Sequence, residues 1–225
     1  MSDGEPTSLR LVATMTIAGL ISGLTLVGIY VGTLPMIQRN RAAFLSRAIL
    51  GDSEADDERD RRPLLPGAES FTTMELRGNE LVRFEGAEGE APAGPALYMA
   101  YDADGQFVGY GIPAEGPGFQ DTVALIYGFD ATRRVIVGMR VLESRETPGL
   151  GDKIIFDEHF LSNFEALAVE PTIVPVKKGE RSAPNEIDCI TGATISSKAV
   201  VTILNRSTEQ WLPRIGATPP AGGQS

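Results

Sequence analysis

The longest uninterrupted apolar stretch of the chain lies close to its start. No charged residue occurs from Leu11 to Gln38, and this run is longer than the roughly 20 residues that span the hydrocarbon core of a bilayer. The pattern predicts a transmembrane helix over residues 11–34, preceded by an N-terminal tail at 1–10 and closed by Pro35 and an arginine-rich segment. Its length argues against a buried core helix, and the lack of a clear small-residue cleavage site argues against a cleaved signal peptide.

Farther along, apolar and polar residues alternate in short segments that predict strands. The segment "ALYMAYDADGQFVGYGI", residues 96–112, predicts two strands joined by an Asp-Gly turn. The segments "DTVALIYGFD" and "RVIVGMRVLES" predict a second hairpin, and a further strand is expected at "PTIVPVK". Hairpins of this kind build an antiparallel sheet.

Helical spacing of apolar residues marks two other segments. One is "DKIIFDEHFLSNFEAL", residues 152–167, and the other is a last helix that begins at Ile195. The residues expected to face inward from these segments are Ile155, Phe160, Phe164 and Leu167, and then Val200, Ile203, Leu204 and Trp211.

These elements predict an α+β fold, with a single N-terminal transmembrane helix followed by one mixed α/β domain with antiparallel hairpins. The domain is expected over residues 69–213. Residues 35–68 are expected to form a juxtamembrane segment and a charged linker, because "GDSEADDERDRRPLLPG" is dense in charge and poor in apolar residues. Residues 214–225 are expected to form a flexible tail.

Charge and residue counts narrow the classes of function. The net charge of −10 argues against a nucleic-acid partner, because phosphate binding depends on clustered Lys and Arg. The single cysteine, Cys189, excludes an internal disulfide, and with His159 as the single histidine no zinc or iron–sulfur site is expected. A hydrolase that uses Cys189 or Ser196 with His159 is the least favoured class, because a lone cysteine beside Ile190 is more often a packed apolar residue.

Two features of the apolar stretch concern its partners and its orientation. Two G-x-x-x-G spacings, at residues 19–23 and 28–32, would let neighbouring membrane helices approach closely, although glycine is common in membrane helices generally. Arg10 precedes the span and three arginines follow it within residues 39–47, which favours a cytoplasmic C-terminal side. That rule weakens when a long domain follows, so the residues alone leave the orientation open.

Two turns that contain glycine stand out as candidate sites. The first is "ESRETPGLGDKI", residues 143–154, where residues without side chains would let the backbone approach a ligand closely. The second is "DCITGATISSKAV", residues 188–200, where a helix that begins at Ile195 would place Thr194 at its N-cap. A helix cap and a phosphate-binding helix N-terminus require the same residues. The residues of this turn alone therefore leave both interpretations of Thr194 open.

The second turn resembles a known family signature. Asp188, Thr191, Gly192, Ala193 and Thr194 form D-x-x-T-G-A-T, which is similar to the acceptor motif of FMN-binding domains that a flavin transferase modifies. In that family the last threonine of the motif carries FMN through a phosphoester bond. The segment "ETPGLGDKI" resembles a second landmark of the family, and "VGYGI", "GPGFQD" and "IYGFD" match its intervening hairpins.

The resemblance implies a set of residues that hold the cofactor. Thr194 is the covalent attachment point, and the electron chemistry belongs to the flavin ring. Glu146 and Thr147 are expected to form hydrogen bonds with the ring and Leu150 to pack on it. Asp188 is expected to shape the turn or to bind the metal of the transferase. The other expected cofactor-binding residues are Thr191, Gly192, Ala193, Ser196, Gly149 and Gly151.

With its N-terminal anchor, the whole chain is similar to the G subunits of Rnf ion-translocating electron transport complexes. The resemblance implies a membrane protein that relays electrons beside other membrane subunits, without catalysing NAD chemistry itself. The complex as a whole would couple electron flow between ferredoxin and NAD to the movement of Na⁺ or H⁺ across the membrane. It also implies maturation by a flavin transferase and a domain on the periplasmic side of the bacterial inner membrane, where covalent attachment prevents loss of the flavin. Two alternatives remain: the equivalent subunit of a Na⁺-translocating NADH:quinone reductase, which shares this domain, and a flavin-free membrane-tethered assembly or sensor domain.

Overall fold

A seven-stranded antiparallel sheet forms the centre of the domain. The computed structural model describes residues 8–55, 58–86, 90, 92 and 94–216. The strands lie in the order β2-β1-β3-β4-β5-β6-β7, and a separate parallel pair joins β8 to β9. The strand bounds are β1 Ser70–Arg77, β2 Glu80–Arg83, β3 Ala96–Tyr101, β4 Phe107–Pro117, β5 Thr122–Asp130, β6 Val135–Glu143, β7 Leu167–Ala168, β8 Val174–Val176 and β9 Glu186–Asp188.

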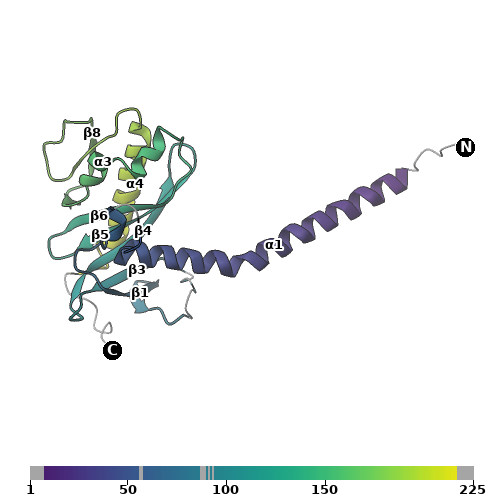
Figure 1. The fold of residues 1–225 in the computed structure, drawn as a ribbon, viewed down its shortest axis with the longest axis horizontal. Helices are drawn as coiled ribbons and strands as arrows, with labels where there is room; N and C mark the ends of the chain where they lie inside the picture. Colours follow the sequence, from purple (N-terminus) through teal and green to yellow (C-terminus); the bar gives the residue numbers. More distant parts are fainter. Residues whose placement is uncertain (1–7, 56–57, 87–89, 91, 93, 217–225) are drawn as a thin grey trace, which may run out of the picture.

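The helices differ greatly in length. Figure 1 shows α1 as a long rod whose N-terminal part projects away from the domain, while α3 and α4 lie with the strands. The helix bounds are α1 Ser8–Leu50, α2 Glu58–Arg61, the 3₁₀ helix η1 Gly151–Ile155, α3 Glu158–Ser162 and α4 Thr194–Trp211.

Both predicted hairpins are confirmed, and aspartate side chains close their turns. Asp102 Oδ1 accepts hydrogen bonds from the backbone N–H groups of Asp104 at 3.0 Å and Gln106 at 2.7 Å, between β3 and β4. In the same way an oxygen of Asp130 accepts from the N–H of Thr132 at 2.9 Å, between β5 and β6. Because these contacts are local in sequence, each turn is specified by a few neighbouring residues.

Helix α4 covers one face of the sheet. The hydroxyl groups of Tyr127 and Ser207 form a 2.9 Å hydrogen bond that ties α4 to strand β5. Burial raises the pKa of Tyr127 above its ordinary value, so this phenol stays protonated. The predicted inward residues of the helix are all buried in the main core: Val200, Ile203, Leu204 and Trp211.

The end of α1 covers the opposite face of the sheet. Tyr98 of β3 and Ile126 of β5 point to this side, whereas their neighbours along each strand point toward α4. They pack with Ala48, Ile49 and Leu64 in a second hydrophobic cluster. The sheet therefore lies between the anchor helix and α4.

Arg140 of β6 secures the end of α1 to the sheet. Its guanidinium donates hydrogen bonds to the backbone carbonyls of Ala48 and Arg62. The Leu64 N–H donates to the carbonyl of Ile49 at 2.9 Å. Carbonyl groups in the last turn of a helix have no partner within the helix, so these donors satisfy the end of α1 where it meets the domain.

Helix α1 is longer than the sequence predicts. By length and composition, residues Arg10–Leu34 could cross a membrane, with a mean hydropathy of 1.9, and this range overlaps the predicted span. The helix does not end at Pro35 but continues to Leu50. Proline removes only one helical hydrogen bond, and the residues that follow it are rich in the helix formers Ala, Leu and Arg.

Both ends of the predicted domain pack beyond the expected boundaries. Leu64 and Leu65, at the end of the segment expected to be a charged linker, are 4% and 1% exposed. After the last helix, Ile215 is buried and the Tyr110 hydroxyl donates to the carbonyl of Gly216 at 3.1 Å. The rest of the predicted C-terminal tail, residues 217–225, and residues 1–7 of the N-terminal tail lie outside the described residues.

Residues 152–167 form two short helices rather than the single helix predicted. Asp157 separates η1 from α3, because its side chain accepts a hydrogen bond from the Phe160 N–H at 2.9 Å and so starts a new helix. The predicted core residues of this segment are buried except Ile155, which is exposed because the tighter 3₁₀ turn places Ile154 inward instead.

We expect Arg140→Ala to lower the free energy of unfolding by about 1–3 kcal/mol, because it leaves the carbonyls of Ala48 and Arg62 without their donor. Thermal unfolding of the detergent-solubilised chain checks this value. Arg133→Ala, on the exposed β5–β6 turn, is the matched control and should stay within about 0.5 kcal/mol of wild type. Equal melting of the two variants would contradict the role of Arg140 at the end of α1.

Candidate functional site at the start of helix α4

A tight turn leads into α4. The Ala193 N–H donates to the carbonyl of Ile190 at 3.0 Å, and Gly192 adopts a left-handed φ of +83°. A β-carbon at Gly192 would meet no atom within 4 Å, so the requirement for glycine is conformational rather than steric. Thr191 and Gly192 are exposed, whereas Ala193 is buried in the main core.

Thr194 is the first residue of α4 and not its cap. Ala193 occupies the N-cap position. Ser197 stabilises the turn instead, since its Oγ accepts from the Ile190 N–H at 3.1 Å and donates to the Ala193 carbonyl at 2.9 Å. Thr194 is exposed, and its hydroxyl forms no hydrogen bond with any described residue. The interpretation of Thr194 as a helix cap is therefore wrong, and its hydroxyl is free.

The start of α4 favours a negatively charged ligand. The N–H groups of Thr194, Ile195 and Ser196 belong to the first turn and have no carbonyl partner within the helix. The helix dipole adds a partial positive charge at this end. Lys198 is exposed four residues after Thr194 and so lies on the same face of the helix. Together with the free hydroxyl, these groups fit a phosphate esterified at Thr194.

A buried carboxylate joins the two turns that contain glycine. Glu146 is 5% exposed, and its Oε1 accepts from the backbone N–H groups of Phe119 at 2.7 Å and Gln120 at 3.1 Å. The Ser196 hydroxyl donates to its Oε2. A β-carbon on Gly151 would lie 2.6 Å from that Oε2 and 2.7 Å from Ser196 Oγ. Three segments therefore meet at the Glu146 side chain: the loop after β4, the loop after β6 and the start of α4.

The predicted cofactor-binding residues of the turn at residues 143–154 are partly buried in the domain and partly exposed. Glu146, expected to form a hydrogen bond with the flavin ring, accepts hydrogen bonds from protein donors on both of its oxygens. The Thr147 carbonyl accepts from the N–H groups of Leu150 at 3.1 Å and Gly151 at 3.0 Å, which folds the turn. Gly149 and Leu150 are exposed at its tip. Thr147 and Leu150 thus remain available to a ligand.

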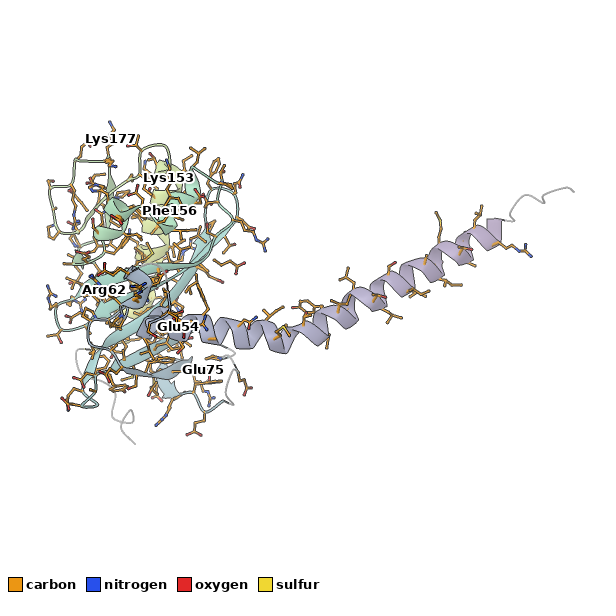
Figure 2. The ribbon with its side chains drawn as sticks, viewed as in Figure 1. Glu54, Arg62, Glu75, Lys153, Phe156 and Lys177 are labelled. Atoms are coloured by element: carbon orange, nitrogen blue, oxygen red, sulfur yellow. The ribbon has the colours of Figure 1, made fainter. Side chains whose placement is uncertain are left out.

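Exposed apolar side chains surround this junction. Phe119, Leu150 and Ile195 are 58%, 51% and 60% exposed, and each comes from one of the three segments that meet at Glu146. We call these three residues the apolar rim. Figure 2 shows that Phe156, which follows η1, lies at the same end of the domain. Exposed apolar side chains grouped in this way are typical of a ligand-binding or partner-binding surface. Phe119 and Ile195 were not predicted, because a lone apolar residue in a loop or first turn has no periodic signal.

Asp188 is turned into the domain. It is 5% exposed, its Oδ1 accepts from the Arg181 N–H at 3.1 Å, and its Oδ2 lies 3.1 Å from Nε2 of His159. The Asp188 N–H donates to Asn163 Oδ1 at 3.1 Å. Burial opposes ionisation, but hydrogen bonds from Gly179, His159 and Arg181 outweigh it and hold the pKa of Asp188 below its ordinary value. The geometry favours the predicted role in shaping the turn over metal binding on a second protein.

The alternative nucleophiles are not arranged for catalysis. Ser196 is buried against Glu146, and His159 pairs with Asp188. Cys189 is 3% exposed, and burial raises the pKa of its thiol, which disfavours the reactive thiolate. Within the described parts of the chain, neither Cys189 nor Ser196 forms a hydrogen bond with His159.

A groove of about 870 Å³ lies away from this site and is lined by residues of α1, of strands β3 to β6 and of α4. Phe44 and Leu45 of α1 and Ile203 and Trp211 of α4 line it. Ile203 is nine residues along α4 from Thr194, which is roughly 13 Å by helical rise. The groove is therefore separate from the free hydroxyl.

Comparison with known proteins identifies the class of protein. The FMN-binding domain family matches residues 118–209, a stretch that contains the Glu146 junction and Thr194. The fold matches NqrC of Shewanella oneidensis with a TM-score of 0.55 at 16% identity, covering 74% of this chain and 91% of that one. It also matches the C subunit of the Na⁺-translocating NADH-quinone reductase of Parabacteroides distasonis, with a TM-score of 0.58 at 21% identity over 80% and 93% of the two chains. At these identities the likeness establishes the α+β fold alone.

Curated relatives narrow the class to one family. The chain is 31% identical over 151 residues to the G subunit of the Na⁺-translocating ferredoxin:NAD⁺ oxidoreductase complex of Acetobacterium woodii, which covers 65% of this chain and 70% of the relative. It is 33% identical over 126 residues to the G subunit of the ion-translocating oxidoreductase complex of Methanosarcina acetivorans, and 35% identical over 133 residues to that of Aliivibrio fischeri. These two alignments cover 55% and 56% of this chain but only 63% and 60% of the relatives, less than two thirds of their length. The chain belongs to the family of G subunits of ion-translocating oxidoreductase complexes.

Asp188→Asn should weaken the turn before α4 and change its dependence on pH. Because the folded-state pKa of Asp188 is lowered, its contribution to stability is present above the ordinary pKa and is lost as pH falls through the folded value. We therefore expect the variant to be less stable than wild type at about pH 7 and to lose less stability between about pH 5 and pH 2. Denaturant unfolding across this range measures both effects. Parallel curves for the two proteins would contradict the role of the ionised carboxylate.

Proposed function

We propose that this chain is a membrane-anchored flavoprotein that carries FMN covalently on Thr194 and relays electrons within an ion-translocating ferredoxin:NAD oxidoreductase complex. The observation that carries the proposal is the exposed Thr194 hydroxyl, which stands at the first residue of α4 without a hydrogen-bond partner among the described residues. The match to the FMN-binding domain family and the identity to G subunits support it.

Attachment is a phosphoryl transfer to Thr194 from a flavin dinucleotide, catalysed by a flavin transferase. The bond between Thr194 Oγ1 and the FMN phosphorus forms, and the P–O bond of the pyrophosphate breaks. The departing nucleoside monophosphate takes up the hydroxyl proton, and no electrons are exchanged. Gly192 leaves the approach to the hydroxyl uncrowded, and Lys198 and the N–H groups of the first turn offset the charge of the phosphodiester.

The flavin ring packs on the apolar rim formed by Phe119, Leu150 and Ile195. These side chains offer apolar surface beside the attachment point, which suits the flat body of the ring. Thr147 is the polar contact in this proposal, because its side chain forms no hydrogen bond with any described residue. When bound, FMN supplies the electron-transfer chemistry, and the chain supplies its position.

The ion path and the NAD chemistry belong to partner subunits. From Leu11 to Gln38 the apolar stretch contains no charged residue, and charged groups inside the membrane are the usual mark of an ion or proton path. This chain therefore acts as an electron relay beside other membrane subunits and is an enzyme only as part of the complex.

The domain lies on the periplasmic side of the bacterial inner membrane in this proposal. A covalent bond retains the flavin in a compartment from which free FMN would be lost, and it keeps the ring at high effective concentration beside the apolar rim. The arginines within residues 39–47 favour the opposite orientation. The long folded domain after the span reduces the weight of those charges.

Two alternatives have less support. The C subunits of quinone reductases share the fold at 16% and 21% identity, below the 31% to 35% identity to the G subunits of Acetobacterium woodii, Methanosarcina acetivorans and Aliivibrio fischeri. A flavin-free assembly or sensor domain would have no use for a free threonine hydroxyl beside exposed apolar side chains. Variants at Thr194 separate that alternative from the proposed function.

Thr194→Ala should abolish covalent flavin and leave the fold intact, because the side chain is exposed and its hydroxyl has no partner among the described residues. The chain is produced with its transferase, denatured and run on a gel, and flavin fluorescence is recorded under ultraviolet light. Thr194→Ser should still be labelled because it keeps a hydroxyl. Thr202→Ala, at another exposed threonine of α4, is the control and should be labelled like wild type. Fluorescence of the denatured Thr194→Ala chain would refute attachment at this residue.

Lys198→Glu should slow flavin attachment by about fivefold, because it places a negative charge beside the phosphate that Thr194 receives. Lys198→Arg should keep the wild-type rate. The initial rate of labelling with purified transferase measures the effect, and added salt should reduce the difference by screening. Equal rates for Lys198→Glu and wild type at low salt would rule out this electrostatic contribution.

A further inference from the structure

The geometry points to Glu146 as the positioning residue of the flavin site: its buried carboxylate joins the first turn of α4, where Thr194 faces outward, to the two loops that carry Phe119 and Leu150. This inference rests on the proposed function, because it takes Thr194 as the flavin acceptor. Glu146 acts through Ser196 and the two loops and does not itself contact the flavin.

The buried face of α4 sets its rotation, and one hydrogen bond joins the first turn of that face to the neighbouring loops. Two residues in a helix that are two positions apart point in directions that differ by about 200°. Ser196 is 3% exposed, and its hydroxyl donates to Oε2 of Glu146 on the inner side of the helix. Thr194 must therefore face outward, as its exposure shows. Within the first turn, the Ser196 hydroxyl is the side-chain group that bonds to the loop at Glu146, whereas Ser197 bonds to the turn before the helix.

The same carboxylate also fixes the loops that carry the apolar rim. Its Oε1 holds the N–H groups of Phe119 and Gln120, and the loop with Leu150 continues directly from Glu146. The Thr194 hydroxyl and the apolar rim are thus both positioned by contacts with Glu146. A change in the position of the Glu146 carboxylate would therefore shift the hydroxyl relative to the rim.

The carboxylate suits this position because both of its oxygens accept hydrogen bonds, and here three donors from the protein point to it. Gly151 packs directly against this junction, since a β-carbon there would lie 2.6 Å from Oε2, so a residue with a side chain would not fit without displacing the carboxylate.

A first experiment compares Glu146→Gln with Glu165→Gln, an exposed glutamate after α3. Glutamine keeps the shape but has one acceptor oxygen, so it cannot serve both the loop N–H groups and the Ser196 hydroxyl as the carboxylate does. We expect Glu146→Gln to label about tenfold more slowly than wild type with purified transferase, the scale of one lost buried hydrogen bond. The visible circular dichroism of the attached flavin should also weaken, because the ring no longer rests on an ordered surface. Glu165→Gln should match wild type in both measurements.

A second experiment uses Ser196→Ala and the double variant with Glu146→Gln. Both single changes remove the bond from the Ser196 hydroxyl to a carboxylate oxygen, so the double variant should label little more slowly than Glu146→Gln alone. Thermal unfolding of every variant is recorded, and labelling is measured well below the lowest melting temperature. Ser196→Ala is a small change, so it keeps the test valid if Glu146→Gln folds poorly. A purely structural role would lower the melting temperature without changing the circular dichroism of the attached flavin.

The outcomes separate this inference from the proposed function. Wild-type labelling and wild-type flavin circular dichroism in the folded single variants would overturn the positioning role of Glu146, and so would effects that add in the double variant. Covalent flavin on Thr194→Ala would instead overturn the proposed function itself. Loss of flavin from Thr194→Ala together with slow labelling of Glu146→Gln and Ser196→Ala supports both.

Discussion

The hydrogen bond between the buried carboxylate of Glu146 and the hydroxyl of Ser196 joins the first turn of α4 to the loops beside it, and the site depends on this junction. Because Ser196 points inward, Thr194 points to solvent, and its hydroxyl is left without a partner among the described residues. Ser197 stabilises the turn before the helix by bonding to Ile190 and Ala193. An unpartnered hydroxyl is therefore exposed beside open N–H groups at the start of the helix.

The fold separates membrane attachment from this chemistry. Helix α1 ends against one face of the sheet, where Arg140 satisfies its last carbonyls, and α4 packs on the other face. Sequence periodicity predicts the hairpins and α4, because each depends on local alternation or helical spacing. It does not predict the continuation of α1 to Leu50 or the burial of Leu64 and Leu65, because both follow from docking onto a distant sheet. Tertiary contacts here outweigh two local sequence signals: Pro35, which predicts the end of the helix, and the dense charge, which predicts a solvated linker.

The residues of the candidate site also differ in whether neighbouring sequence is enough to predict them. Thr194 and the turn before it can be found from the motif, since all of its parts are neighbours in sequence. The role of Glu146 cannot, because it depends on donors 26, 27 and 50 residues away. Nor can the apolar rim, because Phe119 and Ile195 come together only when that carboxylate gathers the loops. A polar residue predicted to touch the ligand instead orders the residues around it.

The central claim is that Thr194 carries FMN as a phosphodiester. Intact-mass spectrometry of the mature protein, purified from the membranes of its own host, tests it most directly. The chain should be heavier than its sequence by the mass of FMN less one water, and fragmentation should place that added mass on the peptide that contains Thr194. A mass equal to that of the bare polypeptide in the assembled complex would contradict covalent attachment.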